Sequence, residues 1–129
     1  MAKMKIWRLE DSEGAGVYRG GNYYLKATWD DDEDCNNVNR HPTPHNDDAL
    51  GFYDIHSSIR YDYIFGFTSL SQMHQWVYRA KWRRALTNMS IQLNCYEVDS
   101  EHVRRSPFQA IFNKNYAKLV ESRKPNYRD

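Results

Sequence analysis

Histidine and carboxylate side chains gather in the middle of the chain, and metal coordination is the chemistry that they could perform. Two histidines flank two prolines within residues 41–45, and Asp47, Asp48 and His56 follow. Imidazole nitrogens and carboxylate oxygens suit zinc, but this spacing matches no standard zinc module. A polar loop shaped by the two prolines explains the same residues, so we predict no metal site.

Cysteine paired with histidine could supply a nucleophile, but the pattern around Cys95 favours a structural role. Cys95 alternates with Ile91 and Leu93 along an expected strand, which predicts a small buried side chain. The sequence has no nucleophile elbow, Walker A loop or dinucleotide-binding glycine fingerprint. Local motifs therefore identify no enzyme class.

An acidic run forms the clearest charged segment, and it belongs to a chain whose two halves differ in charge. Residues 1–68 carry 7 Lys/Arg and 12 Asp/Glu, a balance of −5, whereas residues 69–129 carry 11 and 5, a balance of +6. The run could be a solvated loop, a partner-binding surface that imitates nucleic-acid phosphates, or a metal-capturing loop without calcium-loop spacing. As a partner-binding site it would consist of Asp30, Asp31, Asp32, Glu33 and Asp34.

Aromatic and basic side chains alternate in a later segment, where they could contact a protein or a nucleic acid. We rank a core role for the aromatic residues first, a protein interface second and base stacking third. A nucleic-acid site would use residues 76–84 with Arg104 and Arg105. The candidate partner-binding residues of this segment are Trp76, Arg79, Trp82, Arg83 and Arg84.

These residues require positioning elements, and the sequence predicts an α+β fold with a mostly antiparallel sheet. One dominant helix is expected over residues 69–86, because Ser69 and Gln72 have capping-box spacing and apolar residues follow at helical intervals. Strands are expected at 5–9, 61–67, 90–98 and 108–112, and residues 116–122 could form a strand or a short helix. Residues 28–60 lack periodicity and are expected to be loop-rich, and 123–129 to fray.

Length and composition place these elements in one domain spanning residues 1–129. A chain of 129 residues with 15% aromatic residues can bury a core without a metal or a disulfide. There is no apolar run long enough to span a membrane, and the N-terminus lacks the apolar core of a signal peptide. With two cysteines only, an intracellular protein is expected.

The combined pattern resembles small uncharacterised proteins of tailed bacteriophages. The resemblance spans residues 5–120 and implies a role directed at the host, in the cytoplasm of an infected bacterium. Its landmarks are Trp7-Arg8-Leu9-Glu10-Asp11 with Gly14 and Gly16, Arg40-His41-Pro42-x-Pro44 with Asp47-Asp48, Phe65-Gly66-Phe67-x-Ser69-Leu70-x-Gln72 with Trp76, Tyr96-Glu97-Val98, and Gln109-x-Ile111-Phe112.

The strand order is also similar to that of ADP-ribosyltransferase domains, in which an arginine of the first strand contacts the NAD pyrophosphate. This resemblance implies NAD binding by Arg8 or Arg19 and a catalytic position at Gln109. The family usually has a Glu two residues after this position, and here that Glu is missing. A carboxylate is needed to stabilise the cationic transition state. The candidates to replace it lie on a neighbouring strand or loop and are Glu97, Asp99 and Glu101.

We therefore predict a phage-type protein that binds and inactivates a bacterial host or defence protein, as an anti-CRISPR-like inhibitor would, without a cofactor. The alternative is an NAD-dependent ADP-ribosyltransferase-like enzyme that modifies a host target. A third hypothesis is a nucleic-acid-binding protein.

Overall fold

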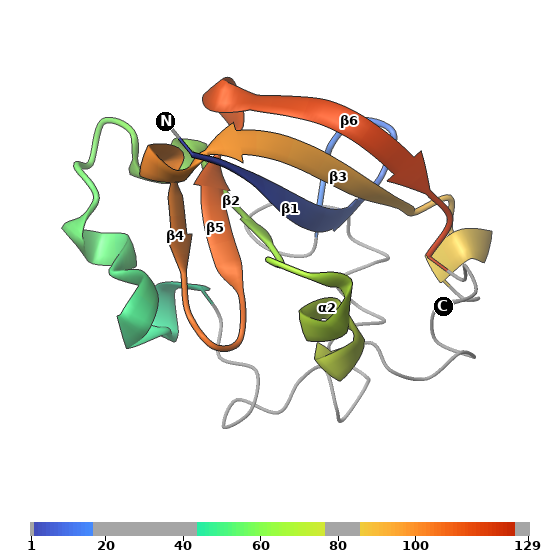
Figure 1. The fold of residues 1–129 in the computed structure, drawn as a ribbon, viewed down its shortest axis with the longest axis horizontal. Helices are drawn as coiled ribbons and strands as arrows, with labels where there is room; N and C mark the ends of the chain where they lie inside the picture. The colour runs from blue at the N-terminus through green and yellow to red at the C-terminus, as the bar shows by residue number, and fades with distance from the viewer. Residues whose placement is uncertain (1, 17–43, 77–85, 126–129) are drawn as a thin grey trace.

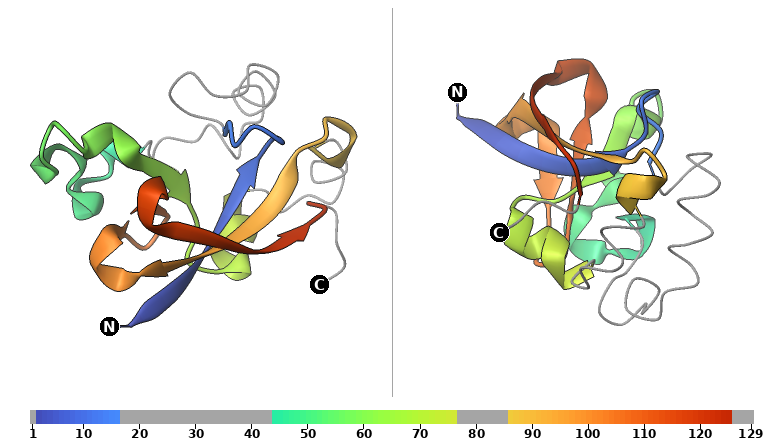
Figure 2. Two further views of the ribbon diagram at one scale, coloured as in Figure 1. Left: turned by 90° about the horizontal axis from the view of Figure 1, so that it is seen from above. Right: turned by 90° about the vertical axis from the view of Figure 1, so that its right-hand side faces the viewer.

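The computed structural model of the chain describes residues 2–16, 44–76 and 86–125, which form two three-stranded antiparallel sheets and one α-helix (Figure 1). In Figure 1 the first sheet lies across the top of the molecule, with the second sheet and the helix beneath it, and Figure 2 shows the same arrangement from two other sides. The expected α+β class with antiparallel strands is confirmed.

The first sheet has the strand order β1-β3-β6, and all of its pairs are antiparallel. β1 and β3 pair over their whole lengths, from Lys3 opposite Asp99 to Glu10 opposite Gln92. For residues 116–122, where a strand and a short helix were both possible, the structure has a strand. The strands are β1 (Lys3–Glu10), β3 (Gln92–Asp99) and β6 (Ala117–Arg123).

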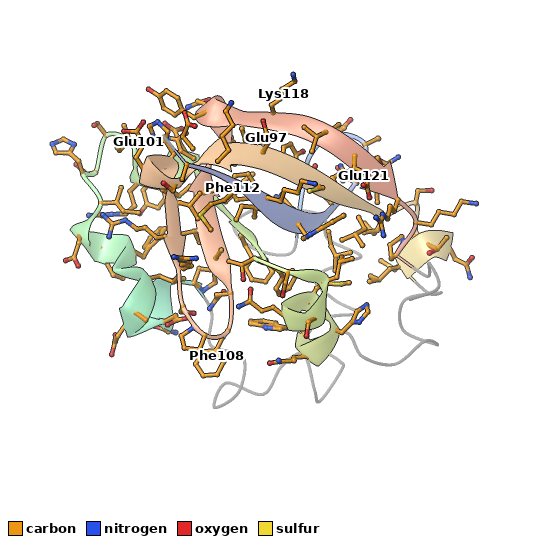
Figure 3. The ribbon with its side chains drawn as sticks, in the orientation of Figure 1. Glu97, Glu101, Phe108, Phe112, Lys118 and Glu121 are labelled. Atoms are coloured by element: carbon orange, nitrogen blue, oxygen red, sulfur yellow. The ribbon has the colours of Figure 1, made fainter. Side chains whose placement is uncertain are left out.

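The second sheet has the order β2-β5-β4 and is built from shorter strands. Phe112 of β5 lies opposite both Ile64 of β2 and Val103 of β4. β4 and β5 form a hairpin whose far end carries Phe108, at the bottom of Figure 3. The strands are β2 (Tyr63–Gly66), β4 (Val103–Arg105) and β5 (Ala110–Asn113).

One pair of backbone hydrogen bonds joins the two sheets. The amide of Trp7 donates to the Phe67 carbonyl over 2.8 Å, and the amide of Phe67 donates to the Trp7 carbonyl over 2.7 Å. Gly66 makes this approach possible, because a Cβ there would lie 2.7 Å from Ile6 Cγ2 and 2.8 Å from the Trp7 carbonyl oxygen. Only a residue without a side chain fits between these strands.

Helix α2 (Leu70–Trp76) begins where the sequence predicts. The Ser69 hydroxyl accepts a hydrogen bond from the Gln72 amide, as the capping-box spacing implies. The Gln72 side chain reaches back one residue further than expected and accepts from the Thr68 amide. Residues 77–85 of the predicted helix lie outside the described residues, and residues 86–88 are helical. Neither this helix nor any other in the described ranges is long and apolar enough to cross a membrane.

Residues 44–62, which comprise the second part of the predicted loop-rich region 28–60 and the first two residues of the predicted strand 61–67, fold into four short 3₁₀ helices. They are held because Leu50, Phe52 and Ile55 are buried against Tyr63 and Ile111 of the second sheet. Apolar anchors within a polar stretch explain why its sequence shows no helical or strand period. Residues 28–43 lie outside the described residues. The 3₁₀ helices are η1 (Pro44–Asn46), η2 (Asp48–Leu50), η3 (Phe52–Asp54) and η4 (Arg60–Asp62).

Two further 3₁₀ turns, η5 (Ser100–His102) and η6 (Lys114–Tyr116), connect the two sheets. Their side chains meet, because the rings of His102 and Tyr116 stack with centroids 3.8 Å apart. Arg123, expected at the start of a frayed tail, is instead the last residue of β6, and its guanidinium lies over the Trp7 ring.

Besides the cluster under the 3₁₀ helices, the core of the described residues has two parts that include side chains of the first sheet. One part packs α2 against Leu9 and Leu93 of the first sheet, with Trp76 at its centre. The other places Ile6 and Val98 against Phe112 of the second sheet. Cys95 is buried, as predicted, and burial raises the pKa of its thiol.

Replacing Gly66 with alanine should destabilise the protein by about 1–3 kcal/mol, the usual cost of forcing extra atoms into a packed interior. The added methyl group would push β2 away from β1 and weaken the Trp7–Phe67 hydrogen bonds. Urea unfolding followed by tryptophan fluorescence measures this loss, with exposed Ser122→Ala on β6 as the control. Equal stability of Gly66→Ala and the wild type would show that the junction tolerates a side chain.

Candidate functional site

The Arg8 side chain, a predicted NAD contact, lies buried between the two sheets. Its guanidinium donates from Nε to the Glu10 carboxylate and from Nη1 to the Phe65 carbonyl, both over 2.8 Å. A third hydrogen bond runs from Nη2 to the Gly14 carbonyl at 3.1 Å. Gly16 packs so closely that a Cβ there would lie 2.6 Å from Nη2. All three guanidinium nitrogens are therefore engaged by protein groups.

Glu10 is the acceptor that organises this region, which we call the buried polar centre (Arg8, Glu10, Asn94 and Tyr96). Besides Arg8, its carboxylate accepts from Asn94 Nδ2 over 2.7 Å and from the Tyr96 hydroxyl. Burial and the hydrogen bond to this carboxylate raise the pKa of the Tyr96 hydroxyl. Asn94 Oδ1 is buried without a hydrogen-bond partner among the residues that the structure describes. The centre pairs the buried charge of Glu10 with that of Arg8 and satisfies both groups with hydrogen bonds, as a buried structural ion pair requires.

Gln109, a predicted catalytic residue, belongs to a different polar cluster at the end of the β4–β5 hairpin. Its side chain is fully buried and donates from Nε2 to Asp47 Oδ2 over 3.0 Å. The Ser106 hydroxyl donates to the same oxygen over 2.5 Å. Gln72 of α2 donates to the carbonyls of Ser106 and Pro107. These bonds tie η2, α2 and the hairpin together.

Glu97, the other predicted catalytic residue, lies far from Gln109 and faces away from Arg8. Arg8 pairs with Asn94 in the register, so it shares a face of the sheet with Asn94 and Tyr96, while Glu97 points to the opposite face. Glu97 forms an ion pair with Lys3 at 3.6 Å. Figure 3 shows Glu97 on the upper sheet and Phe108, the neighbour of Gln109, at the opposite end of the molecule. The structure does not bring the three residues together.

The predicted partner-binding residues are only partly described. Trp76 is 1% exposed and donates from Nε1 to the Phe108 carbonyl, so it serves the core and is not presented at the surface. Arg104 donates to the carbonyls of Leu50 and Gly51, whereas Arg105 is exposed. The remaining candidates lie outside the described residues: Arg19, Asp30, Asp31, Asp32, Glu33, Asp34, Arg79, Trp82, Arg83 and Arg84.

A surface that the sequence analysis missed lies on η3 and η4, at one end of the molecule in Figures 1 and 2. Tyr53 is 62% exposed, Tyr61 52% and Ile59 42%. We call these three side chains, together with Arg60, the aromatic knob. Projecting tyrosines, an isoleucine and an arginine are residue types that can anchor protein interfaces, tyrosine and arginine most often.

The buried Phe52 ring and the Arg60 side chain hold the knob in place. The Phe52 ring is buried and contacts the Tyr53 ring at 5.2 Å and the Tyr61 ring at 6.1 Å between centroids. Arg60 donates to the carbonyls of Tyr53 and Ile55 and lies over the Tyr53 ring. The two tyrosines are therefore ordered before any partner arrives, which lowers the entropy cost of binding.

One signal in the sequence could have indicated the knob. Five of residues 52–62 are aromatic or aliphatic hydrophobic, too many for a purely solvated loop. The sequence does not show which of them point inward. Only the packing of Phe52 and Ile55 on the second sheet leaves Tyr53, Ile59 and Tyr61 outside.

A family model described as "Bacteriophage T4 Y00F protein" matches residues 4–126 of the chain. Except for Lys3 at the start of β1, the match covers the six strands that the structure describes and α2. It confirms the expected likeness to phage proteins at the level of a family. No curated protein and no solved structure matches the chain.

Replacing Tyr96 with phenylalanine should make the stability less sensitive to alkaline pH. The tyrosine pKa is raised in the folded protein, so its stabilising effect is complete below the unfolded pKa of about 10 and is lost as pH rises above that value. Between pH 9 and 11 the wild type should lose up to about 1 kcal/mol more of its unfolding free energy than Tyr96→Phe.

Urea unfolding at several pH values measures this difference. Exposed Tyr116→Phe is the control, because it removes one tyrosine from the surface. Parallel curves for the wild type and Tyr96→Phe would mean that the Tyr96 proton is not held by Glu10.

Proposed function

Because the chain belongs to the family of the bacteriophage T4 Y00F protein, we propose that it acts in an infected bacterium by binding a host or defence protein and inactivating it. This is the action of an anti-CRISPR-like inhibitor, carried out in the cytoplasm and without a cofactor. The single observation that carries the proposal is the aromatic knob.

The knob suits binding to a protein because its large side chains are exposed and yet ordered. The rings of Tyr53 and Tyr61 both contact the buried Phe52 ring, and Ile59 adds aliphatic surface. Tyrosine offers a broad apolar face with a hydroxyl at its tip, so it can fill a pocket and still form a hydrogen bond. A partner would cover these side chains and gain the free energy of removing them from water.

The outer edge of β6 is a second exposed feature, but it is protected against strand pairing. Between Cys95 opposite Glu121 and Tyr96 opposite Leu119, β6 contains one extra residue, Val120. Such a bulge disturbs the hydrogen-bonding pattern of an edge strand, and the charged Lys118 and Glu121 beside it discourage pairing further. The knob has no such protection, so we favour it as the contact surface.

Catalysis on NAD receives no support from the placement of its candidate residues. The Arg8 guanidinium is used inside the protein, and Glu97 and Gln109 lie at separate places. Of the two arginines predicted to contact a nucleic acid from β4, Arg104 donates to backbone carbonyls, which does not favour that role, whereas Arg105 is exposed.

The double variant Tyr53→Ala/Tyr61→Ala should lose its partner. Each tyrosine at an interface centre typically contributes 1–2 kcal/mol or more, so capture should fall at least about tenfold. The measurement is a pull-down from lysate of a bacterial host with the immobilised full chain, quantified by mass spectrometry. Both side chains are largely exposed, so the variant should fold as the wild type does, which circular dichroism checks.

Tyr116→Ala is the matched control, because Tyr116 is 59% exposed and lies on η6, outside the knob. The proposal expects one protein to be captured by the wild type and by the control but not by the double variant. A partner retained equally by all three proteins would remove the knob from the interface. Capture of no specific partner would reject direct binding.

A further inference from the structure

Residues 44–62, which carry the aromatic knob, have a negative formal charge. The segment holds four aspartates and one arginine, a formal balance of −3. Asp48 and Asp54 are exposed, and Asp62 is partly exposed. Asp47 is buried and accepts from Ser106 and Gln109, so it contributes little to the surface.

Two arginines contact this segment, and both donate hydrogen bonds to its backbone carbonyls. Arg60 uses Nε and Nη2 for the carbonyls of Ile55 and Tyr53, and its plane covers the Tyr53 ring. Arg104 of β4 reaches under the same segment to the carbonyls of Leu50 and Gly51. Both guanidinium groups support the backbone of the knob. The outward-facing charge at its base therefore comes from the aspartates.

We infer that the partner of the knob is a protein whose contact surface is an apolar pocket surrounded by lysine and arginine side chains. This inference rests on the proposed function and adds the chemistry of the partner to it. Exposed carboxylates at the rim of an interface raise the rate of encounter with a basic surface, while the buried apolar anchors slow dissociation. The knob supplies the anchors, and Asp48, Asp54 and Asp62 supply the rim.

The negative charge of residues 44–62 favours a basic protein as the partner over a nucleic acid or an anionic membrane. The phosphates of a nucleic acid and the headgroups of an anionic membrane would be repelled by three carboxylates next to the tyrosines. Two tyrosines could stack on bases, but stacking surfaces for nucleic acids are combined with basic grooves. A basic protein surface with an apolar pocket would complement both the apolar side chains of the knob and the aspartates of the same segment.

The test is the association rate of the partner captured in the pull-down, measured by surface plasmon resonance on the full chain at low and at physiological salt. The triple variant Asp48→Asn/Asp54→Asn/Asp62→Asn should associate about three- to tenfold more slowly at low salt, with a weaker salt dependence and a nearly unchanged dissociation rate. Tyr53→Ala/Tyr61→Ala should mainly accelerate dissociation.

A matched control changes the net charge by the same amount at other places. The control variant is Glu13→Gln/Glu97→Gln/Glu121→Gln. It removes three carboxylates outside segment 44–62, one each from the turn after β1, from β3 and from β6. This variant should associate as fast as the wild type. If it slows association as much as the aspartate variant, net charge alone is responsible and the inference fails.

The two proposals fail in distinguishable ways. Loss of capture in the tyrosine variant together with an unchanged association rate in the aspartate variant would overturn only the basic partner surface. Full capture by the tyrosine variant would overturn the proposed function and, with it, this inference. A labelled duplex DNA is titrated in parallel by fluorescence anisotropy. DNA binding that the tyrosine variant abolishes would overturn a protein partner in favour of nucleic acid.

Discussion

The close approach of β1 and β2 at Gly66 is the constraint on which the rest of the structure depends. The two hydrogen bonds between Trp7 and Phe67 turn two small sheets into one framework, and neither sheet alone is large enough to enclose a core. The junction divides the interior into a part under α2 and a part around Phe112. Because interiors are close-packed, a single methyl group at Gly66 would disturb the part around Phe112 and the Trp7 carbonyl at the junction.

The buried polar centre supports the same junction from within. Arg8 joins β1 to β2 through the Phe65 carbonyl, and Glu10 compensates its charge. Burying an ion pair is costly unless its remaining donors and acceptors are satisfied, and here Asn94 and Tyr96 help to satisfy Glu10. An arginine that looks available for an anionic ligand in the sequence is therefore committed to the fold. Removing its guanidinium would leave a buried carboxylate without its counter-charge.

The aromatic knob shows how the fold can present a rigid surface from a segment with little regular structure. Phe52 and Ile55 anchor the segment against the second sheet, and Arg60 donates to its backbone carbonyls. The tyrosines then have few other conformations to lose on binding. For the proposed binding of a host protein, such an ordered contact reduces the conformational entropy that is lost on association.

The sequence by itself determined the elements whose signals are local. Strand alternation predicted β1 and β3, the segment 61–67 was predicted as a buried strand and contains β2, the Ser69–Gln72 spacing predicted the start of α2, and Cys95 was assigned correctly to the interior. Only the tertiary structure decided which polar residues meet, because contacts between distant strands depend on register and on which face each side chain occupies. It separated Arg8 from Glu97 and Gln109, and it exposed the tyrosines of the knob by burying their apolar neighbours.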